Sequence, residues 1–293
     1  MSHTDASKRH DFVYFFEVAD GNPNGDPDAG NLPRTDPETM QGLVSDVCVK
    51  RKVRNWIDAS EDANAPEHKI YVREGDVLKN KQQDAYTALD IEDDDAERKD
   101  VENARAWMCE QFYDIRTFGA VMSHSEFNCG QVLGPLQLTF ARSVNPISPM
   151  EVSIVRSVPL SEEQKEDKGD MMFGRKSIVP YGLYCGHGFY NPTAAEDTGA
   201  TDEDLDLFWQ ALVNCWELDR SASRGRMAPR GLCVFSHDNK LGNAPAHQLF
   251  DQVTAEKSGD VDAPRSFDDY DVDVPSGDAL PDGVTLTCVI DPR

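Results

Sequence analysis

The run Phe12 to Val18, FVYFFEV, restricts the fold of this 293-residue chain more than any other segment. Six of its seven residues are aromatic or β-branched. Such residues favour an extended backbone and pack well on the pleated surface of a sheet. The run therefore predicts a buried β-strand, and any fold of this chain must supply a sheet around it.

The segments that follow extend this prediction into a fold class. Apolar residues at helical spacing predict helices over 43–57 and 202–217, the second with acidic residues crowded at its N-terminus. Runs rich in strand-forming residues at 136–141, 177–186 and 232–237 predict strands. The core order is then strand, helix, two strands, helix, strand. This is the α+β, ferredoxin-like arrangement shared by the RRM, although the aromatic RNP signature of RNA-binding RRMs is not visible in the sequence.

The length suits one domain with large insertions, so we expect a single RRM-like domain over 1–293. A polar insertion is expected at about 58–111. A charged excursion is expected at 157–180, between two predicted strands. The weakly patterned segment 251–283, rich in Asp, Gly and Pro, predicts acidic loops ahead of a final strand at 284–290.

The charge balance is strongly acidic, with 53 Asp and Glu against 29 Lys and Arg and a formal net charge of −24. Taken alone, this surface would repel a polyanion such as nucleic acid. Adaptation to high salt is a second explanation, because Asp is about twice as common as Glu and Lys is scarcer than Arg. In molar salt the Debye length falls to about 3 Å, so distant carboxylates barely oppose a local basic site.

The seven cysteines form no C-x-x-C pair, which is typical of reduced thiols in a cytosol. Cys185 and His187, with His124 and Cys129 upstream, do not have the spacing of a known structural zinc site. No segment is long and apolar enough to span a membrane, and the polar start MSHTDASKRHD does not predict a signal peptide. We therefore expect a cytoplasmic protein without a metal or other cofactor.

The loop at 20–31, DGNPNGDPDAGN, begins like an EF-hand calcium loop, but Asn31 stands where a bidentate Glu is required. Its Asn-Pro, Asn-Gly and Asp-Pro pairs are typical of consecutive turns. The loop continues to about residue 42, and a loop of this length is usually functional or disordered. We therefore expect turns here rather than a metal site.

The strongest local charge anomaly is KRKVR at 50–54, with four cations in five positions of the predicted helix. One explanation is a solvated helix end, where cations favour the C-terminal dipole. The other is a basic site for a ligand. From the residues alone the first is favoured.

The excursion at 157–180 ends in Met171-Met172-Phe173, followed by Gly174, Arg175 and Lys176. Bulky apolar side chains with cations beside them can wedge between nucleobases. A small satellite core beneath a loop explains the same residues equally well.

Several stretches together resemble a known family. The stretch at 16–56, FEVADGNPNGDPDAGNLPRTDPETMQGLVSDVCVKRKVRNW, is similar to the N-terminal signature of the backbone subunit of the type I-C CRISPR Cascade complex, in the Cas7 family. The resemblance continues through FGAVM, GQVLGPLQLTFARSVNPI, FGRKSIVPYGLY and LGNAPAHQLF and covers most of the chain. DVCVKRKVRN fits the I-C form better than a related subtype that has a similar NPNGDPD loop.

The resemblance implies an RRM-like palm with finger insertions and a thumb hairpin. It implies copies stacked head to tail along the CRISPR RNA, pairing of the guide with target DNA, further Cascade subunits as partners, and no catalysis. The residues that it implies for RNA binding lie in the loop, the basic helix and the thumb: Asn22, Asn24, Arg34, Ser45, Lys50, Arg51, Arg54, Met171, Met172, Phe173, Arg175 and Lys176. Arg224, Arg226 and Arg230 are weaker candidates, because they can pair with the acidic surface.

An enzymatic alternative comes from the backbone subunits of type III CRISPR complexes, which resemble this fold and cut target RNA with an Asp on a comparable loop. Asp26 or Asp28 could play that part with Mg²⁺, since a metal-bound hydroxyl can attack a phosphodiester. Two Asp in a turn-rich loop are more often turn formers. A scaffold that binds only protein is a third alternative.

Overall fold

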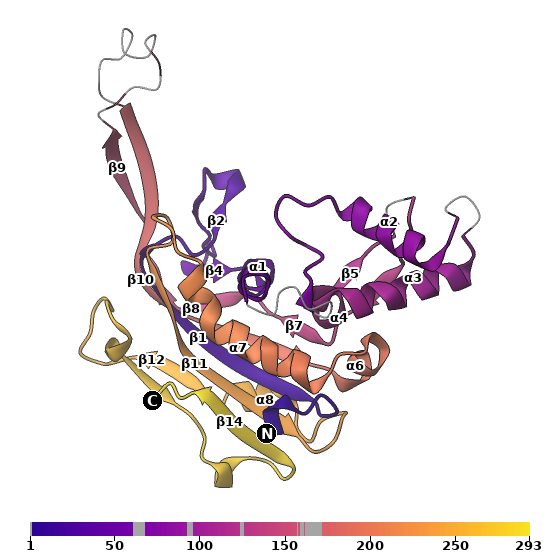
Figure 1. The fold of residues 1–293 in the computed structure, drawn as a ribbon. Coiled ribbons are helices and arrows are strands. Elements are labelled where there is room, and N and C mark those ends of the chain that lie inside the picture. Colours follow the sequence, from indigo (N-terminus) through magenta and orange to yellow (C-terminus); the bar gives the residue numbers. More distant parts are fainter. Residues whose placement is uncertain are drawn as a thin grey trace.

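The computed structural model describes residues 2–60, 68–92, 96–123, 126–156, 158, 161 and 172–293. An antiparallel sheet forms its centre, and two further strands, β7 and β9, pair with β10 (Figure 1). The path across the sheet runs through β14 (Val284–Ile290), β11 (Arg226–His237), β1 (His10–Gly21), β10 (Met172–Tyr190), β8 (Ala141–Pro146) and β4 (Gln41–Val44). β7 spans Leu136–Leu138 and β9 spans Met150–Arg156. The structure confirms a mixed α and β architecture.

The predicted strand at 12–18 is confirmed as the middle of β1, which lies between β10 and β11. Its residues alternate between the two faces of the sheet and are buried on both. Phe12, Tyr14 and Phe16 belong to one apolar cluster, and Val13 and Phe15 belong to another. Two different layers therefore cover the sheet.

Helices α1 (Asp46–Asp58) and α7 (Asp202–Leu218) cover one face, as Figure 1 shows, and both were predicted. Thr201 caps α7 through a capping box with Asp204, which explains its sharp start. Trp216 of α7 stacks on Phe16 with ring centroids 4.4 Å apart. Truncating such a buried aromatic side chain typically costs about 3–5 kcal/mol.

Within the insertion expected at 58–111, the described residues form α2 (Leu78–Leu89) and α3 (Arg98–Gln111). With α4 (Tyr113–Phe118), β5 (Gly119–Val121) and β6 (Gln131–Leu133) they enclose an apolar cluster of their own. A buried ion pair joins this unit to α7: the Arg116 guanidinium donates to both carboxylate oxygens of Asp204, at 2.8 and 2.6 Å.

The C-terminal segment covers the other face of the sheet. It contains α8 (Ala246–Phe250) and the paired strands β12 (Thr254–Lys257) and β13 (Tyr270–Asp273). The two strands lie within 251–283, where the sequence indicated only loops. Its Val253 and Tyr270 pack in the cluster that holds Val13 and Phe15 of β1. A short helix, α6 (Pro192–Thr198), follows β10. The 3₁₀ helices are Ser2–Thr4, Pro27–Ala29, Phe267–Asp269 and Gly277–Ala279.

β9 and the first part of β10 form a hairpin that projects far from the rest of the molecule (Figure 1). It leaves the body at Met150, which pairs with Ile178, so it begins before the excursion expected at 157–180. Met171 lies outside the described residues. Met172 and Phe173 begin β10, but their side chains also lie outside the description.

The expectation that all cysteines are free thiols is wrong in this structure. Cys233 of β11 lies directly opposite Cys288 of β14, and the two form a disulfide. Neighbouring antiparallel strands bring opposite side chains to disulfide distance, which spacing in sequence cannot reveal.

The described residues contain no group of three or more His, Cys, Asp or Glu able to hold a metal ion. The Cys185 sulfur lies 4.0 Å from Nε2 of His187, whereas Cys129 is buried in the cluster of the insertion. His124 lies outside the description. No described helix has the length and apolarity needed to cross a membrane.

Candidate nucleic-acid interface

The first part of the interface is the contact between the loop at residues 22–24 and the start of α1. The Asn24 side-chain oxygen accepts hydrogen bonds from the backbone N–H and the hydroxyl of Ser45, at 2.9 and 3.0 Å. Ser45 is in turn the N-cap of α1 and accepts from the N–H of Cys48. The two predicted site residues are therefore together, and they fix the loop against the positive end of the helix dipole.

The cations of α1 are largely turned inward. Lys50 pairs with Asp46 at 3.3 Å, and Nε of Arg54 donates to Asp114 at 2.7 Å, each with a side chain only 11% exposed. Lys52 is also buried and pairs with Asp219, while burial lowers its pKa to about 8. Hence most of this basic cluster has its charge compensated inside the protein.

Arg51 is the exception, with a side chain 62% exposed. It lines a groove of about 550 Å³, which we call the helix groove. Its partner Glu74 is 80% exposed, and such surface pairs contribute little to stability. The groove is lined by Asn24, Ser45, Val47, Cys48, Arg51, Arg54, Asn55, Val72, Arg73, Glu74 and Arg224.

Four guanidinium groups and one carboxylate line the helix groove. Each guanidinium also has a carboxylate partner: Glu74 for Arg51, Asp114 for Arg54, Asp58 for Arg73 and Asp219 for Arg224. Arg51 and Arg73 have side chains 62% and 55% exposed, so these two are the most accessible to a ligand.

Arg73 was not predicted, because it lies in the insertion far from the basic cluster in sequence. Arg224 was only a weaker candidate. Its guanidinium donates to the backbone carbonyls of Asn22 and Pro23, at 3.1 and 2.8 Å, so it holds the loop as well as lining the groove.

The loop and the turn at 223–224 approach so closely that one position must be glycine. The N–H of Asn22 donates to the Ser223 carbonyl at 2.7 Å. A Cβ atom on Gly21 would lie 1.8 Å from the carbonyl oxygen of Arg224. The glycine at 21 therefore permits the contact that joins the loop to the start of β11.

A second groove of about 370 Å³, which we call the hairpin groove, lies on the other side of the same loop. It is lined by Asn22, Ala29, Gly30, Asn31, Leu32, Glu151, Arg175, Lys176, Ser177 and Ser223. Arg175 and Glu151 face each other across the projecting hairpin at 3.6 Å, both largely exposed. Lys176 has no carboxylate partner among the described residues.

The structure thus brings most predicted residues of the loop, helix and hairpin base to two grooves that meet at Asn22–Asn24. Arg34 lines neither groove. It follows the short strands β2 (Gly25–Asp26) and β3 (Leu32–Pro33) and lies 3.6 Å from the Asp26 carboxylate. Arg226 and Arg230 both lie against the buried carboxylate of Glu17, at 3.7 and 2.7 Å, away from the grooves.

Asp26 of the loop has a structural role. It caps the 3₁₀ helix at Pro27–Ala29 by accepting the N–H of Asp28 at 3.2 Å, and it also pairs with Arg34. This agrees with the interpretation of Asp26 as a turn former.

The structure thereby defines an α+β protein with a central antiparallel sheet and an interface of arginine- and lysine-lined grooves beside a projecting hairpin. Its sequence matches the family model described as CRISPR-associated protein Cas7 over residues 8–275, so the chain belongs to the Cas7 family. A curated relative, the CRISPR-associated protein Cas7 of Haloferax volcanii, is 26% identical over 232 residues. The match covers 70% of this chain and 64% of that relative, so the chain spans somewhat less than two thirds of its length.

Two solved structures are also similar. A chain of a "CRISPR RNA-guided surveillance complex, pre-nicking" matches with a TM-score of 0.49 and 14% identity, over 79% of both chains. A chain of a "CRISPR RNA-guided surveillance complex" matches with a TM-score of 0.48 and 15% identity, over 81% of this chain and 73% of that one.

Proposed function

We propose that this chain is a backbone subunit of a type I-C CRISPR surveillance complex that holds the guide RNA by its sugar-phosphate backbone. Its partners are CRISPR RNA, further copies of itself stacked head to tail, other Cascade subunits and, through the guide, target DNA. It acts in the cytoplasm. Membership of the Cas7 family and the two grooves lined by arginine and lysine side chains support this role.

The observation that carries the proposal is the meeting of both grooves at one loop. Arg51, Arg73 and Arg224 on one side and Lys176 on the other supply charge for phosphates, and the first turn of α1 adds a positive dipole end. Such contacts are independent of base identity. They leave the base edges free for pairing with target DNA, which is where the sequence is read.

The proposal gives Lys50 and Arg54 a supporting role, since both pair with carboxylates, at 3.3 and 2.7 Å, and have side chains only 11% exposed. Four strands and two helices of the central sheet and its helical face make up the RRM-like palm of the proposal, and α1 and β10 among them contribute residues to the grooves. Their chain order, β1, α1, β8, β10, α7, β11, follows the β-α-β-β-α-β succession.

The test measures RNA binding by the double variant Arg51→Ala with Lys176→Ala. Binding is measured by fluorescence anisotropy of single-stranded RNAs of different sequence across a KCl series. Both residues are on the surface, so the fold should persist. We expect weaker binding for every sequence and a salt slope reduced by about 1.4, or roughly 0.7 for each lost phosphate contact.

The charge-matched control is Lys69→Ala with Lys99→Ala, two exposed lysines outside both grooves. If the control loses as much affinity as the groove variant, only net charge matters and the grooves are not the RNA site.

The proposal also assigns no catalysis to the chain, and the structural roles of Asp26 support this. Incubating the assembled complex with complementary RNA and Mg²⁺ should leave that RNA intact. Regularly spaced cuts that disappear in Asp26→Ala or Asp28→Ala would establish the endoribonuclease alternative instead.

A further inference from the structure

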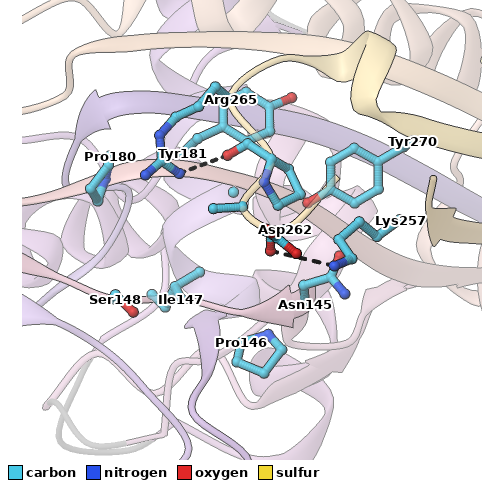
Figure 2. Close-up of a pocket in the computed structure, with 13 residues that line it drawn as sticks. Asn145, Pro146, Ile147, Ser148, Pro180, Tyr181, Lys257, Asp262, Arg265 and Tyr270 are labelled. Atoms are coloured by element: carbon cyan, nitrogen blue, oxygen red, sulfur yellow. Dashed lines mark hydrogen bonds between the residues drawn. The ribbon is translucent and has the colours of Figure 1, made fainter. Parts of the chain in front are cut away.

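A cavity of about 350 Å³ lies on the side of the sheet that the C-terminal segment covers, at the base of the projecting hairpin. We call it the back pocket. Figure 2 shows Asn145, Pro146, Ile147 and Ser148 along one side and Arg265 and Tyr181 along the opposite side. Tyr181 and Tyr270 of its wall belong to the apolar cluster beneath that segment, which fixes the pocket to the body of the protein.

Two cations line the back pocket, and neither lies within 4.0 Å of a carboxylate in the part of the chain that the structure describes. Among the described residues, most Lys and Arg side chains lie within 4.0 Å of a carboxylate. Those that do not are Lys69, Lys99, Lys176, Lys257 and Arg265. Lys257 and Arg265 therefore stand out, because they line one cavity of a chain with net charge −24.

Asp262 also lines the back pocket, but among the described residues no carboxylate lies within 4.0 Å of the Lys257 ammonium or the Arg265 guanidinium. The Lys257 ammonium donates to the backbone carbonyl of Asp262 at 3.4 Å, and the Arg265 guanidinium to the carbonyl of Pro264 at 2.8 Å, as the dashed lines in Figure 2 mark. The Asp269 carboxylate accepts the backbone N–H groups of Arg265 and Ser266, not the guanidinium. Both cations therefore keep donors for an incoming anion.

The pocket has the chemistry of a site for one carboxylate or phosphate group. An ammonium and a guanidinium are the strong charge-assisted donors for such oxyanions. Asn145 and Ser148 on the facing wall add neutral hydrogen-bonding groups. Pro146, Pro180 and Ile147 supply apolar surface on which the methylene groups of a side chain can pack.

The surroundings favour a single carboxylate over a nucleic-acid strand. Residues 251–283, which contribute both cations, carry ten Asp and Glu against Lys257 and Arg265 alone. A phosphodiester chain would bring several further negative charges against these carboxylates. A protein can instead insert one acidic side chain flanked by neutral residues.

We propose that the back pocket receives an Asp or Glu side chain of a second copy of this chain. Charge complementarity supports a second copy as the source of this side chain, because each copy carries 53 acidic residues. Few cations among the described residues lack a carboxylate partner, so Lys257 and Arg265 are among the few sites available to such a side chain. In the proposed head-to-tail stack, the pocket of one copy faces a different surface of the next copy, so the contact is heterologous and propagates from copy to copy. The inference rests on the self-assembly part of the proposed function and adds a location for it.

The direct test is zero-length cross-linking with a carbodiimide, which joins an amine to a carboxylate in contact with it. The RNA-loaded protein is assembled from equal parts of isotopically light and heavy copies, and the cross-linked peptides are identified by mass spectrometry. We expect Lys257 joined to an Asp or Glu peptide of the other isotope. Lys257 that is unmodified, or joined only within its own copy, overturns the proposal.

The second test is self-association of Lys257→Ala with Arg265→Ala, measured by sedimentation velocity with and without RNA. We expect association at least about tenfold weaker than in the unsubstituted protein, because each acidic side chain would lose its partners on burial. Lys69→Ala with Lys99→Ala, which removes the same charge elsewhere, should associate normally. Equal weakening in both variants, or none in either, contradicts the inference.

RNA retention separates the remaining outcomes. If the Lys257 and Arg265 variant assembles normally but releases RNA, the pocket is a nucleic-acid site and the proposed occupant is wrong. A protein that binds RNA but never self-associates contradicts both this inference and the assembly part of the proposed function. Assembly of the Arg51 and Lys176 variant that persists after RNA is lost supports a contact between copies that does not depend on RNA.

Discussion

Two groups of cations on opposite faces of the central sheet are held in opposite ways. On the helical face, Lys50, Lys52 and Arg54 have side chains at most 11% exposed and pair with carboxylates. On the face covered by the C-terminal segment, Lys257 and Arg265 line a pocket, and among the described residues neither lies within 4.0 Å of a carboxylate. A dense basic cluster in the sequence is therefore a poor guide to where positive charge meets solvent, because long-range pairing decides it.

The largest effect that tests this contrast is expected from Arg54→Ala. This substitution would remove the cationic partner of Asp114, whose side chain is 1% exposed. Among the described residues, the Asp114 carboxylate would then keep the backbone N–H groups of Tyr71 and Val72 as its donors. Leaving such a buried carboxylate unpaired should cost about 3–5 kcal/mol of unfolding free energy, measured by denaturant titration. Arg51→Ala, one turn away on the exposed side, should stay within about 0.5 kcal/mol. Equal costs for both would mean that Arg54 is not an internal partner.

A smaller effect is expected from Cys288→Ser on the opposite face, since the bond to Cys233 fastens the last strand to β11. The loss should be about 2–4 kcal/mol. Reduction of the unsubstituted protein should remove the same amount. Thiol titration of denatured, unreduced protein should find only the free cysteines Cys48, Cys109, Cys129, Cys185 and Cys215. Reaction of all seven would show that the disulfide does not form in solution.

Acid should also lower the free energy of unfolding, because the ring of His10 is buried and resists protonation in the folded protein. Burial lowers the pKa of His10 to about 4, and its ring bonds Ser236 Oγ at 2.9 Å and the Asp5 carbonyl at 2.8 Å. The unfolded chain binds this proton near pH 6.5, so stability falls as the pH drops from there toward 4. From about pH 7 to about pH 5 this group alone should remove about 2 kcal/mol.

His10→Gln should lack that part of the pH dependence, measured by denaturant titration at each pH. Exposed His247→Gln should retain it. Identical pH profiles for the unsubstituted protein and His10→Gln would show that His10 is not held neutral by burial.

The smallest expected effect is that of salt on the melting temperature. Salt screens the mutual repulsion of a chain with net charge −24, whereas pairs such as Arg54–Asp114 are shielded from it. The melting temperature should therefore rise from about 0.2 M to about 2 M KCl. A melting temperature highest at low salt would contradict adaptation of this surface to high salt.

The sequence predicted the helices and strands whose apolar residues recur at regular spacing. β1, α1 and α7 were found from apolar periodicity and capping, because each buries one continuous stripe or run. The strands β12 and β13 were missed because each is short and set among Asp, Gly and Pro.

The candidate site was predicted in part for the same reason. Asn22, Asn24, Ser45 and Arg51 lie near one another in sequence, and the grooves contain them. The pairing of Arg54 with Asp114 spans 60 residues, and the contact of Arg224 with Asn22 spans 202. Such partners follow from the fold and not from spacing, so neither the inward direction of the basic helix nor the place of Arg224 could be predicted.

The central claim, that the guide backbone follows the two grooves that meet at Asn22–Asn24, is tested most directly by a cryo-EM map of the RNA-loaded assembly. The account predicts phosphate density within hydrogen-bonding distance of Arg51 and Arg224 on one side of the loop and Lys176 on the other, with the base edges facing away. A guide strand that passes along another surface of the subunit would contradict it.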